Sequence, residues 1–138
     1  MNALSTLKIW CRKWLAGAFA LSLLWTSLPA QAFAWKRLVK TDTLTVYVDM
    51  STLERDGDVR RIWEMQDLAN PDPNGVRSRR YVNEIDCQQK YHRIGNMTSF
   101  SGPKLTGERR FEVEDMGYWR KVPPDGTFAV TYVLLCVE

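Results

Sequence analysis

The sequence predicts a single exported domain built mainly from antiparallel β-strands. Three observations lead to this fold class: segments in which apolar and polar residues alternate, Gly- and Pro-containing turns between them, and two cysteines that follow an export signal. The chain has 138 residues, which suits one ordinary domain and leaves no room for a two-domain enzyme. Its hydrophobic fraction of 45% is sufficient for a core and excludes a wholly disordered chain.

Residues 1–32 have the three parts of a secretory signal. These parts are, in order, the basic residues Lys8, Arg12 and Lys13, the uncharged apolar stretch 14–25, and a small-x-small cleavage pattern at 28–32. The apolar run is shorter than the roughly 20 residues needed to span a bilayer, which favours a cleaved signal over a membrane anchor. We therefore expect 33–138 to be the mature domain, located in the periplasm, at the cell surface or outside the cell.

The charge balance argues against a nucleic-acid partner. The sequence has 19 basic and 16 acidic residues, a net charge of +3, but three of the basic residues lie in the signal. Removing these three leaves 16 basic residues against 16 acidic ones, so the mature domain is expected to be neutral overall. A protein that binds nucleic acid usually keeps a basic surplus.

Alternating apolar and polar residues place the strands of the mature chain. In 43–49, for example, Leu44, Val46 and Val48 share one face of the expected strand. The expected strands are 35–40, 43–49, 59–68, 78–93, 97–101 and 108–114. A short helical turn is expected over 49–54, and turns or breaks are expected at 55–58, 69–75, 95–96, 102–103 and 115–118.

The last segment, 127–136, is ambiguous. It is rich in strand-forming residues, so residue propensity favours a strand. However, Phe128, Tyr132 and Leu135 also fall on one helical face, and the prolines before the segment suit the start of a helix. Both alternatives bury the same apolar residues.

Because the chain is expected to be exported, its cysteines are expected to form a disulfide. Cys11 leaves with the signal, so Cys87 and Cys136 remain in an oxidising compartment, where two thiols usually pair. A bridge closing a loop of about 50 residues is worth roughly 4 kcal/mol in the chain-entropy model. The chain has no Cys-x-x-Cys and only one histidine, which argues against a metal site or a redox pair.

The sequence contains no recognisable catalytic set, so we expect no enzymatic activity, no cofactor and no metal. It has no Gly-x-Ser-x-Gly, no phosphate-binding glycine loop and no His-Glu-x-x-His. His92 is the only histidine, and its position in the expected strand places it on the polar face. The acidic pairs Glu84/Asp86 and Glu112/Glu114 are each expected on a solvated face, since alternation gives that spacing in any one-sided sheet.

One group of residues could bind a partner. Arg77, Arg79 and Arg80 form a small basic cluster at the end of the Pro-rich loop, which could meet an acidic protein surface or could simply be solvated. Trp63 and Trp119 are expected in the core rather than at a ligand site.

Several fragments, taken in order, resemble the surface-adhesin protein E-like family of small exported bacterial proteins. The fragments are Trp35-Lys-Arg-Leu38, Val46-Tyr-Val-Asp49, Ser51-Thr-Leu53, Val59-Arg-Arg-Ile-Trp63, Ser78-Arg-Arg80, Ile85-Asp-Cys87, Arg93-Ile94, Val122-Pro-Pro124 and Cys136. The resemblance implies an α+β fold: an antiparallel sheet of about six strands, with a C-terminal helix docked on it and tethered by a Cys87–Cys136 disulfide. It also implies a dimeric adhesin that binds host extracellular-matrix or serum proteins.

The functional hypothesis from the sequence is therefore a non-enzymatic exported interaction module of the adhesin type, with a homodimer as a further expectation. The alternative is a periplasmic or envelope protein with a housekeeping role that binds a small ligand in the concavity of its sheet.

The first prediction concerns processing. N-terminal sequencing of the exported protein should begin at Phe33, or at Trp35 if cleavage follows Ala34, because both sites complete an Ala-x-Ala pattern. Recovery of the exported chain with Met1 still in place would contradict a cleaved signal.

Overall fold

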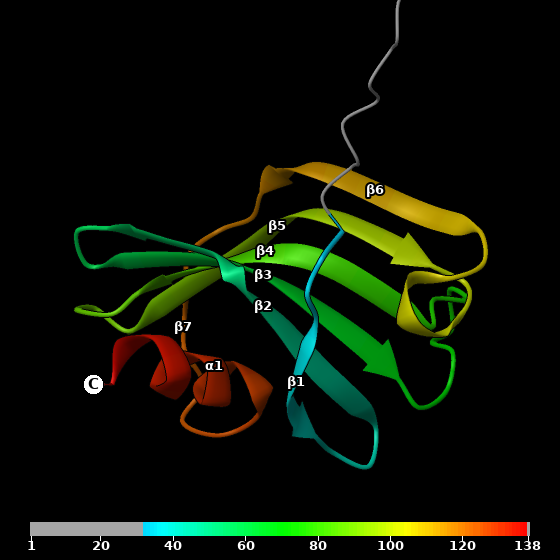
Figure 1. Cartoon of the computed structure of the whole chain (residues 1–138), viewed down its shortest axis with the longest axis horizontal. Helices are drawn as coiled ribbons and strands as arrows, with labels where there is room; N and C mark the ends of the chain where they lie inside the picture. Colours follow the sequence, from blue (N-terminus) through cyan, green and yellow to red (C-terminus); the bar gives the residue numbers. More distant parts are fainter. Residues whose placement is uncertain (1–31, 138) are drawn as a thin grey trace, which may run out of the picture. The chain divides into compact units, whose positions relative to one another are not determined.

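Seven strands form one antiparallel sheet in the computed structural model, which describes residues 32–137 (Figure 1). Each of the first five strands pairs with the next along the chain, and the short seventh pairs with the fifth. The strands are β1 Lys36–Lys40, β2 Leu44–Asp56, β3 Val59–Leu68, β4 Ser78–Asp86, β5 Tyr91–Phe100, β6 Arg109–Met116 and β7 Arg120–Lys121. A 3-10 turn, η1, covers Pro103–Leu105, and the helix α1 covers Thr127–Cys136.

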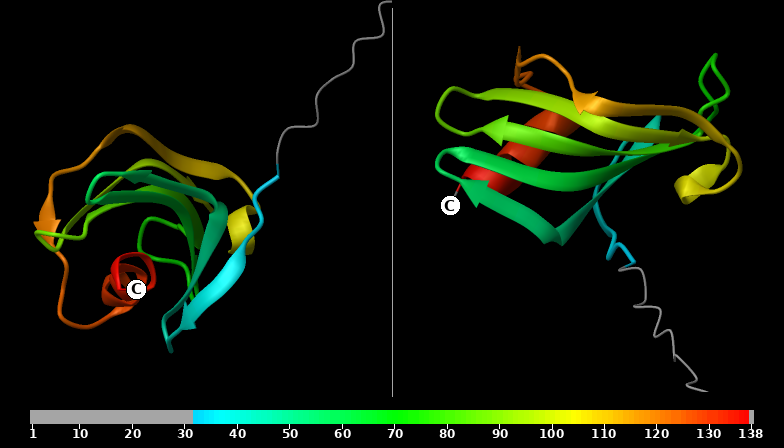
Figure 2. Two further views of the ribbon diagram at one scale, coloured as in Figure 1. Left: turned by 60° about the vertical axis from the view of Figure 1, so that its left-hand side comes forward. Right: turned by 90° about the horizontal axis from the view of Figure 1, so that it is seen from above.

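The sheet curls, and α1 lies in the concavity that it forms (Figure 2). Val48 of β2, Ile62 of β3 and Ile85 of β4 form the buried core together with Leu135 of α1. A sheet with one apolar face needs a second layer to cover that face, and here α1 supplies it. The predicted antiparallel sheet with a C-terminal helix and one disulfide is therefore confirmed.

The predicted N-terminal signal precedes the residues that the structure describes. The signal predicted for residues 1–32 falls almost entirely beyond the described residues, so its cleavage stays a prediction. Within 32–137, no helix is both long and apolar enough to cross a bilayer.

Residues 127–136 are helical, so the strand that residue propensity favours there is wrong. The segment follows Pro123 and Pro124, and Gly126 at its start has a φ of +90°, which only glycine adopts without strain. Thr131 and Leu135, one helical turn apart, are both buried against the sheet. This packing outweighs propensity, which is only a weak local preference.

The long strand predicted over 78–93 is in fact two strands joined by a tight turn at 87–90. The Asp86 carboxylate accepts hydrogen bonds from the backbone amides of Gln88 and Gln89, each at 3.0 Å. Lys90 adopts a left-handed φ of +58°. The turn thus uses an Asp side chain and neither Gly nor Pro, so its sequence signal is weak.

The turn predicted at 95–96 is a bulge within β5, where the register with β6 shifts between Gly95 and Met97. A Cβ atom on Gly95 would lie 2.4 Å from the backbone oxygen of Asp115. Glycine is therefore required for β6 to approach β5 so closely.

The helical turn predicted at 49–54 is a bulged part of β2 instead. The Asp49 carboxylate accepts hydrogen bonds from the backbone amide of Ser51 at 3.0 Å and from that of Ala34 at 2.8 Å. The Thr52 hydroxyl accepts one from the backbone amide of Trp63 at 3.1 Å. The short polar side chains that suggested a helix cap therefore support a bulge.

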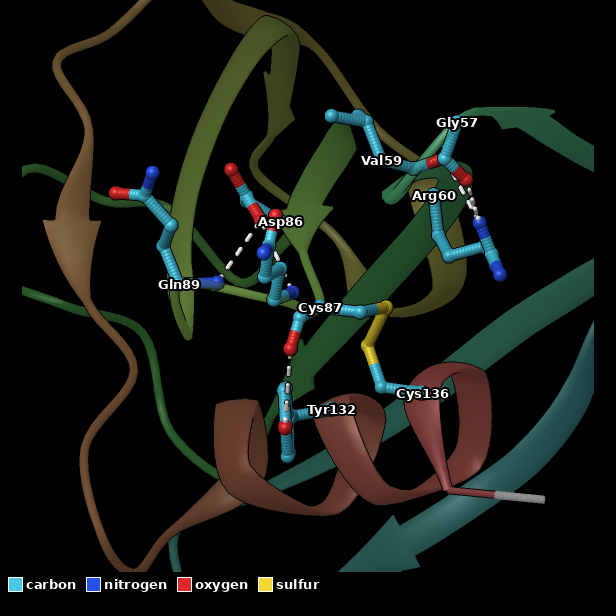
Figure 3. Close-up of a disulfide and its surroundings, with 9 residues drawn as sticks. Gly57, Val59, Arg60, Asp86, Cys87, Gln89, Tyr132 and Cys136 are labelled. Carbon is cyan, nitrogen blue, oxygen red and sulfur yellow. Dashed lines mark hydrogen bonds between the residues drawn. A yellow bond between two sulfur atoms is a disulfide. The ribbon is translucent and has the colours of Figure 1, made fainter.

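A disulfide joins the sheet to α1 (Figure 3). It links Cys87, in the turn after β4, to Cys136, the last residue of α1, with Cα atoms 5.3 Å apart. The Cys87 carbonyl also accepts a hydrogen bond from the Tyr132 hydroxyl at 3.4 Å. The predicted pairing is confirmed, although Cys87 lies one residue beyond its strand and not within it.

The double substitution Cys87→Ala/Cys136→Ala should lower the free energy of unfolding by roughly 2–5 kcal/mol, the usual cost of removing a native bridge from a small exported domain. The end of α1 should loosen first, because a chain end has few other long-range ties. Urea unfolding of oxidised wild type, reduced wild type and the variant measures this loss. Equal stability of all three would contradict it.

Candidate functional site

Strand β6 exposes both of its faces and one edge. Every residue from Arg109 to Asp115 is exposed, including Phe111 and Val113 at 52% each. Within residues 32–137, β6 pairs only with β5, so the backbone groups of its outer edge are unpaired. Such an edge is a template for a further strand. The predicted solvation of Glu112 and Glu114 is confirmed.

The helix α1 has a second exposed apolar surface on the side away from the sheet. We call it the outer stripe, and it consists of Val130, Val133, Leu134 and Val137. Two adjacent hollows of about 440 and 340 Å³ border α1, and Lys121 and Pro123 line both of them. The sequence pattern did not indicate these hollows, because their walls come from three separate segments.

The three arginines of the predicted basic cluster make different contacts in the structure. Arg77 donates to a backbone carbonyl at the end of β3. Arg79 and Arg80 are adjacent in β4 and so point to opposite faces of the sheet. A guanidinium nitrogen of Arg79 lies 3.9 Å from the Asp72 carboxylate, whereas Arg80 stacks over the Phe33 ring at 5.4 Å. The structure therefore does not bring the three onto one surface, and a binding role for them stays a prediction.

Glu84 is buried at 4% exposure, so the solvated face expected for it is wrong. It lies between two arginines on neighbouring strands, accepting from Nε of Arg61 at 2.9 Å and from Nε of Arg93 at 2.8 Å. Burial alone would raise the pKa of Glu84, but these hydrogen bonds outweigh burial and lower it. Arg93 also stacks on Trp119 at 4.6 Å; this tryptophan is exposed, contrary to the expected core position.

His92 lies beneath α1 and not on the polar face, where the sequence placed it. The turn at 87–90 pairs Ile85 with His92, so the alternation of faces changes after the turn. The imidazole centroid is 4.4 Å from that of Phe128, and its Nδ1 has no hydrogen-bond partner among the described residues. Burial and then the positive charge of Arg120 lower the pKa of His92, which favours the neutral ring.

An aromatic cluster holds residues 33–35 to the sheet face opposite α1. Phe33 stacks on Trp35 with ring centroids 4.7 Å apart, and it meets Trp63 of β3 at 5.4 Å. Trp63 is half-buried in this cluster and does not lie in the core beneath α1.

A buried carboxyl group lies under α1, and the sequence analysis did not find it. Glu64 of β3 is 1% exposed and accepts hydrogen bonds from the Tyr81 hydroxyl at 2.8 Å and from Nδ2 of Asn83 at 3.1 Å. Burial raises the pKa of Glu64, and hydrogen bonding from Thr131, Tyr81 and Asn83 opposes that rise only in part. Within residues 32–137, no three His, Cys, Asp or Glu side chains come together as a metal site.

The raised pKa of Glu64 gives a testable pH dependence. In the unfolded chain the carboxyl titrates near 4.5, whereas the folded state holds the proton more tightly. The contribution of Glu64 to stability is therefore greatest below this value and falls as pH rises above it. The variant Glu64→Gln keeps the side-chain shape and an acceptor for the Tyr81 hydroxyl. Its free energy of unfolding should not decrease in this way as pH rises.

Urea unfolding between about pH 4 and pH 8 measures the two slopes. The matched control is Glu112→Gln, which removes an exposed carboxyl and should keep the wild-type slope. A Glu64→Gln variant whose stability changes with pH as wild type does would show that Glu64 does not titrate in this way.

The chain was compared with known families and structures. The model of the family described as surface-adhesin protein E matches residues 35–137. No curated protein matches the sequence. Crystal form II of Haemophilus influenzae protein E is similar at 18% identity and a TM-score of 0.55, covering 78% of this chain and 91% of that one.

The selenomethionine form of the same Haemophilus influenzae protein is similar at 16% identity and a TM-score of 0.55, covering 80% of this chain and 92% of that one. At these identities, the likeness to solved structures supports the fold alone. The family match extends over nearly the whole described region, and on this basis the chain belongs to the surface-adhesin protein E family.

Proposed function

We propose that this chain is an exported, non-enzymatic protein-interaction module of the adhesin type. The observation that carries the proposal is strand β6, which exposes both faces, an unpaired edge and two large apolar side chains. Small soluble domains normally protect such edges unless they use them. Membership of a surface-adhesin family supports the same reading. The sequence also contains no recognisable catalytic motif, which supports a binding role over a catalytic one.

The partners that we propose are host extracellular-matrix or serum proteins, met at the cell surface after export. The alternative, a periplasmic protein with a small ligand in the concavity of its sheet, has less support. Helix α1 occupies that concavity (Figure 2), and its Leu135 belongs to the buried core with residues of β2, β3 and β4. A ligand would have to displace a helix that a disulfide holds in place.

A binding screen tests this proposal. The mature domain should bind at least one immobilised matrix or serum protein saturably in surface plasmon resonance, and protease treatment of intact cells should remove it from the surface. Absence of binding to the whole panel, together with protection inside the periplasm, would contradict the adhesin function and favour the housekeeping alternative.

We also propose that β6 forms a homodimer by pairing with the β6 of a second copy. The strand begins with two basic residues, and two acidic residues directly precede its last residue, Met116. Antiparallel pairing centred on Glu112 would set Arg109 opposite Asp115 and Arg110 opposite Glu114. The same register would set Phe111 opposite Val113 on one face. The two outer charge pairs and the apolar contact are therefore self-complementary, as a two-fold interface requires, and they must outweigh the Glu112 pair at the centre.

Charge reversal tests the dimer. Arg109→Glu/Arg110→Glu makes the strand acidic throughout, and Glu114→Arg/Asp115→Arg makes its ends basic. Each variant alone should be monomeric, because like charges would then face each other across the interface. A mixture of the two should form heterodimers, because all four charged pairs become complementary. Analytical ultracentrifugation measures the three states. A mixture that stays monomeric, or single variants that stay dimeric, would contradict pairing through β6.

A further inference from the structure

Helix α1 is apolar all round, although only one of its sides packs on the sheet. Its ten residues include no charged side chain. The four residues of the outer stripe are between 36% and 58% exposed, and the spacing of Val130, Val133 and Leu134 places these three on one helical face, with Val137 directly after the helix. A helix that is apolar on every side is normally covered on every side. The outer stripe is therefore a surface that lacks its cover.

A groove runs beside the outer stripe. It is the hollow of about 440 Å³, lined on one side by Val122, Pro123 and Pro124 and on the other by Ala129, Tyr132 and Val133. The prolines offer no backbone N–H, so this wall is mainly apolar. The hollow of about 340 Å³ adjoins it and is lined by residues that include Phe128 and the exposed Tyr118. Together they provide recesses that apolar side chains can enter.

The charges around these recesses have one sign. Lys90 and Lys121 line the groove, and Arg93, Arg120 and Lys121 line the second hollow, whereas no carboxylate from residues 32–137 lines either. Arg93 is already bonded to Glu84. Among residues 32–137, by contrast, Lys90, Arg120 and Lys121 take part in no ion pair.

The nearby acidic residues do not neutralise these cations. Asp86 is engaged by the amides of its own turn. Asp125 lines a separate shallow hollow at the start of α1. A neutral mature domain therefore carries an unpaired basic rim at this one apolar surface.

We propose that the outer stripe and these two hollows form a docking surface for an acidic segment of a partner protein that carries apolar side chains. Its apolar side chains would enter the groove and cover Val133 and Leu134, and its carboxylates would pair with Lys90, Lys121 and Arg120. The proposal rests on the proposed function of an interaction module and adds which surface is used and what it recognises. Complementary charge at the rim and apolar contact at the centre are the usual division of roles in an interface.

The shape of the surface favours a polypeptide over a lipid surface as its occupant. A bilayer covers side chains that protrude, but it does not fill recesses lined by lysine and arginine. A peptide can place single side chains into two adjacent hollows and hold a short helix or strand along α1.

A model peptide tests the proposal with the oxidised mature domain. The probe is a labelled synthetic peptide of leucine and glutamate, about 15 residues long, with leucines at helical spacing. Fluorescence anisotropy should show saturable binding, and a matched peptide with lysine in place of every glutamate should not bind. Amide chemical shifts should change in 89–93, 118–124 and 129–137 and leave β6 unaffected.

Two variants and one control locate the binding. Lys90→Glu/Lys121→Glu and Val133→Ser/Leu134→Ser should each weaken the peptide by at least about tenfold, or about 1.4 kcal/mol. The control Lys36→Glu/Lys40→Glu has the same change in charge as the lysine variant but replaces two exposed lysines of β1, and it should keep the affinity. Circular dichroism confirms that each variant is folded.

Several outcomes would overturn the docking surface. These are equal binding of the acidic and basic peptides, unchanged affinity in the lysine variant, or binding to phosphatidylglycerol vesicles in place of the peptide. A change of oligomeric state in Val133→Ser/Leu134→Ser would assign the stripe to a second copy instead. If a matrix or serum protein binds the lysine variant as well as wild type, this surface is wrong while the proposed function stands. If neither the peptide nor any matrix or serum protein binds, the proposed function fails as well.

Discussion

The docking of α1 into the curled sheet is the interaction on which the rest of the structure depends. A ten-residue helix is marginal alone in water, and an uncovered sheet face cannot form a core. Leu135 supplies the apolar contact to Val48, Ile62 and Ile85, and the Cys87–Cys136 bridge holds the end of the helix against the turn after β4. With the concave face closed in this way, the exposed apolar side chains include those of β6 and those on the outward side of α1.

Polar groups beneath the helix restrict how it can dock. An interface made only of aliphatic side chains would tolerate sliding of α1 along the sheet. Glu64, held by Tyr81 and Asn83, requires polar partners at one position, and Thr131 of α1 faces it there. Burying the Glu64 carboxyl lowers stability, as its raised pKa indicates. At any other docking position of α1 the carboxyl would be buried with fewer hydrogen-bond partners, which would lower stability further. This polar contact therefore defines the orientation of α1, and with it the direction in which the outer stripe faces.

Much of the scaffold can be read from the sequence, and a single missed turn accounts for the wrong placement of His92. The alternation in 59–68 gives β3 with the bounds that the structure has, and export of two cysteines gives the disulfide. The turn at 87–90 is formed by the Asp86 side chain, without the Gly or Pro that usually indicates one. If the chain is treated as one strand without this turn, the alternation assigns the residues after the turn to the wrong face of the sheet. The sequence pattern therefore places His92 on the surface, although His92 is buried. The hollows beside α1 could not be predicted, because their residues meet only through the tertiary fold.

Hydrogen–deuterium exchange of the oxidised mature domain tests most directly whether α1 closes the structure. The account predicts that amides in α1 exchange as slowly as those of β3 and β4, whereas the outer-edge amides of β6 exchange quickly in dilute solution. Reduction of the bridge should accelerate exchange in α1 before it affects the central strands. Rapid exchange throughout α1 while the disulfide is intact would contradict the account, because the helix would then not be the layer that covers the core.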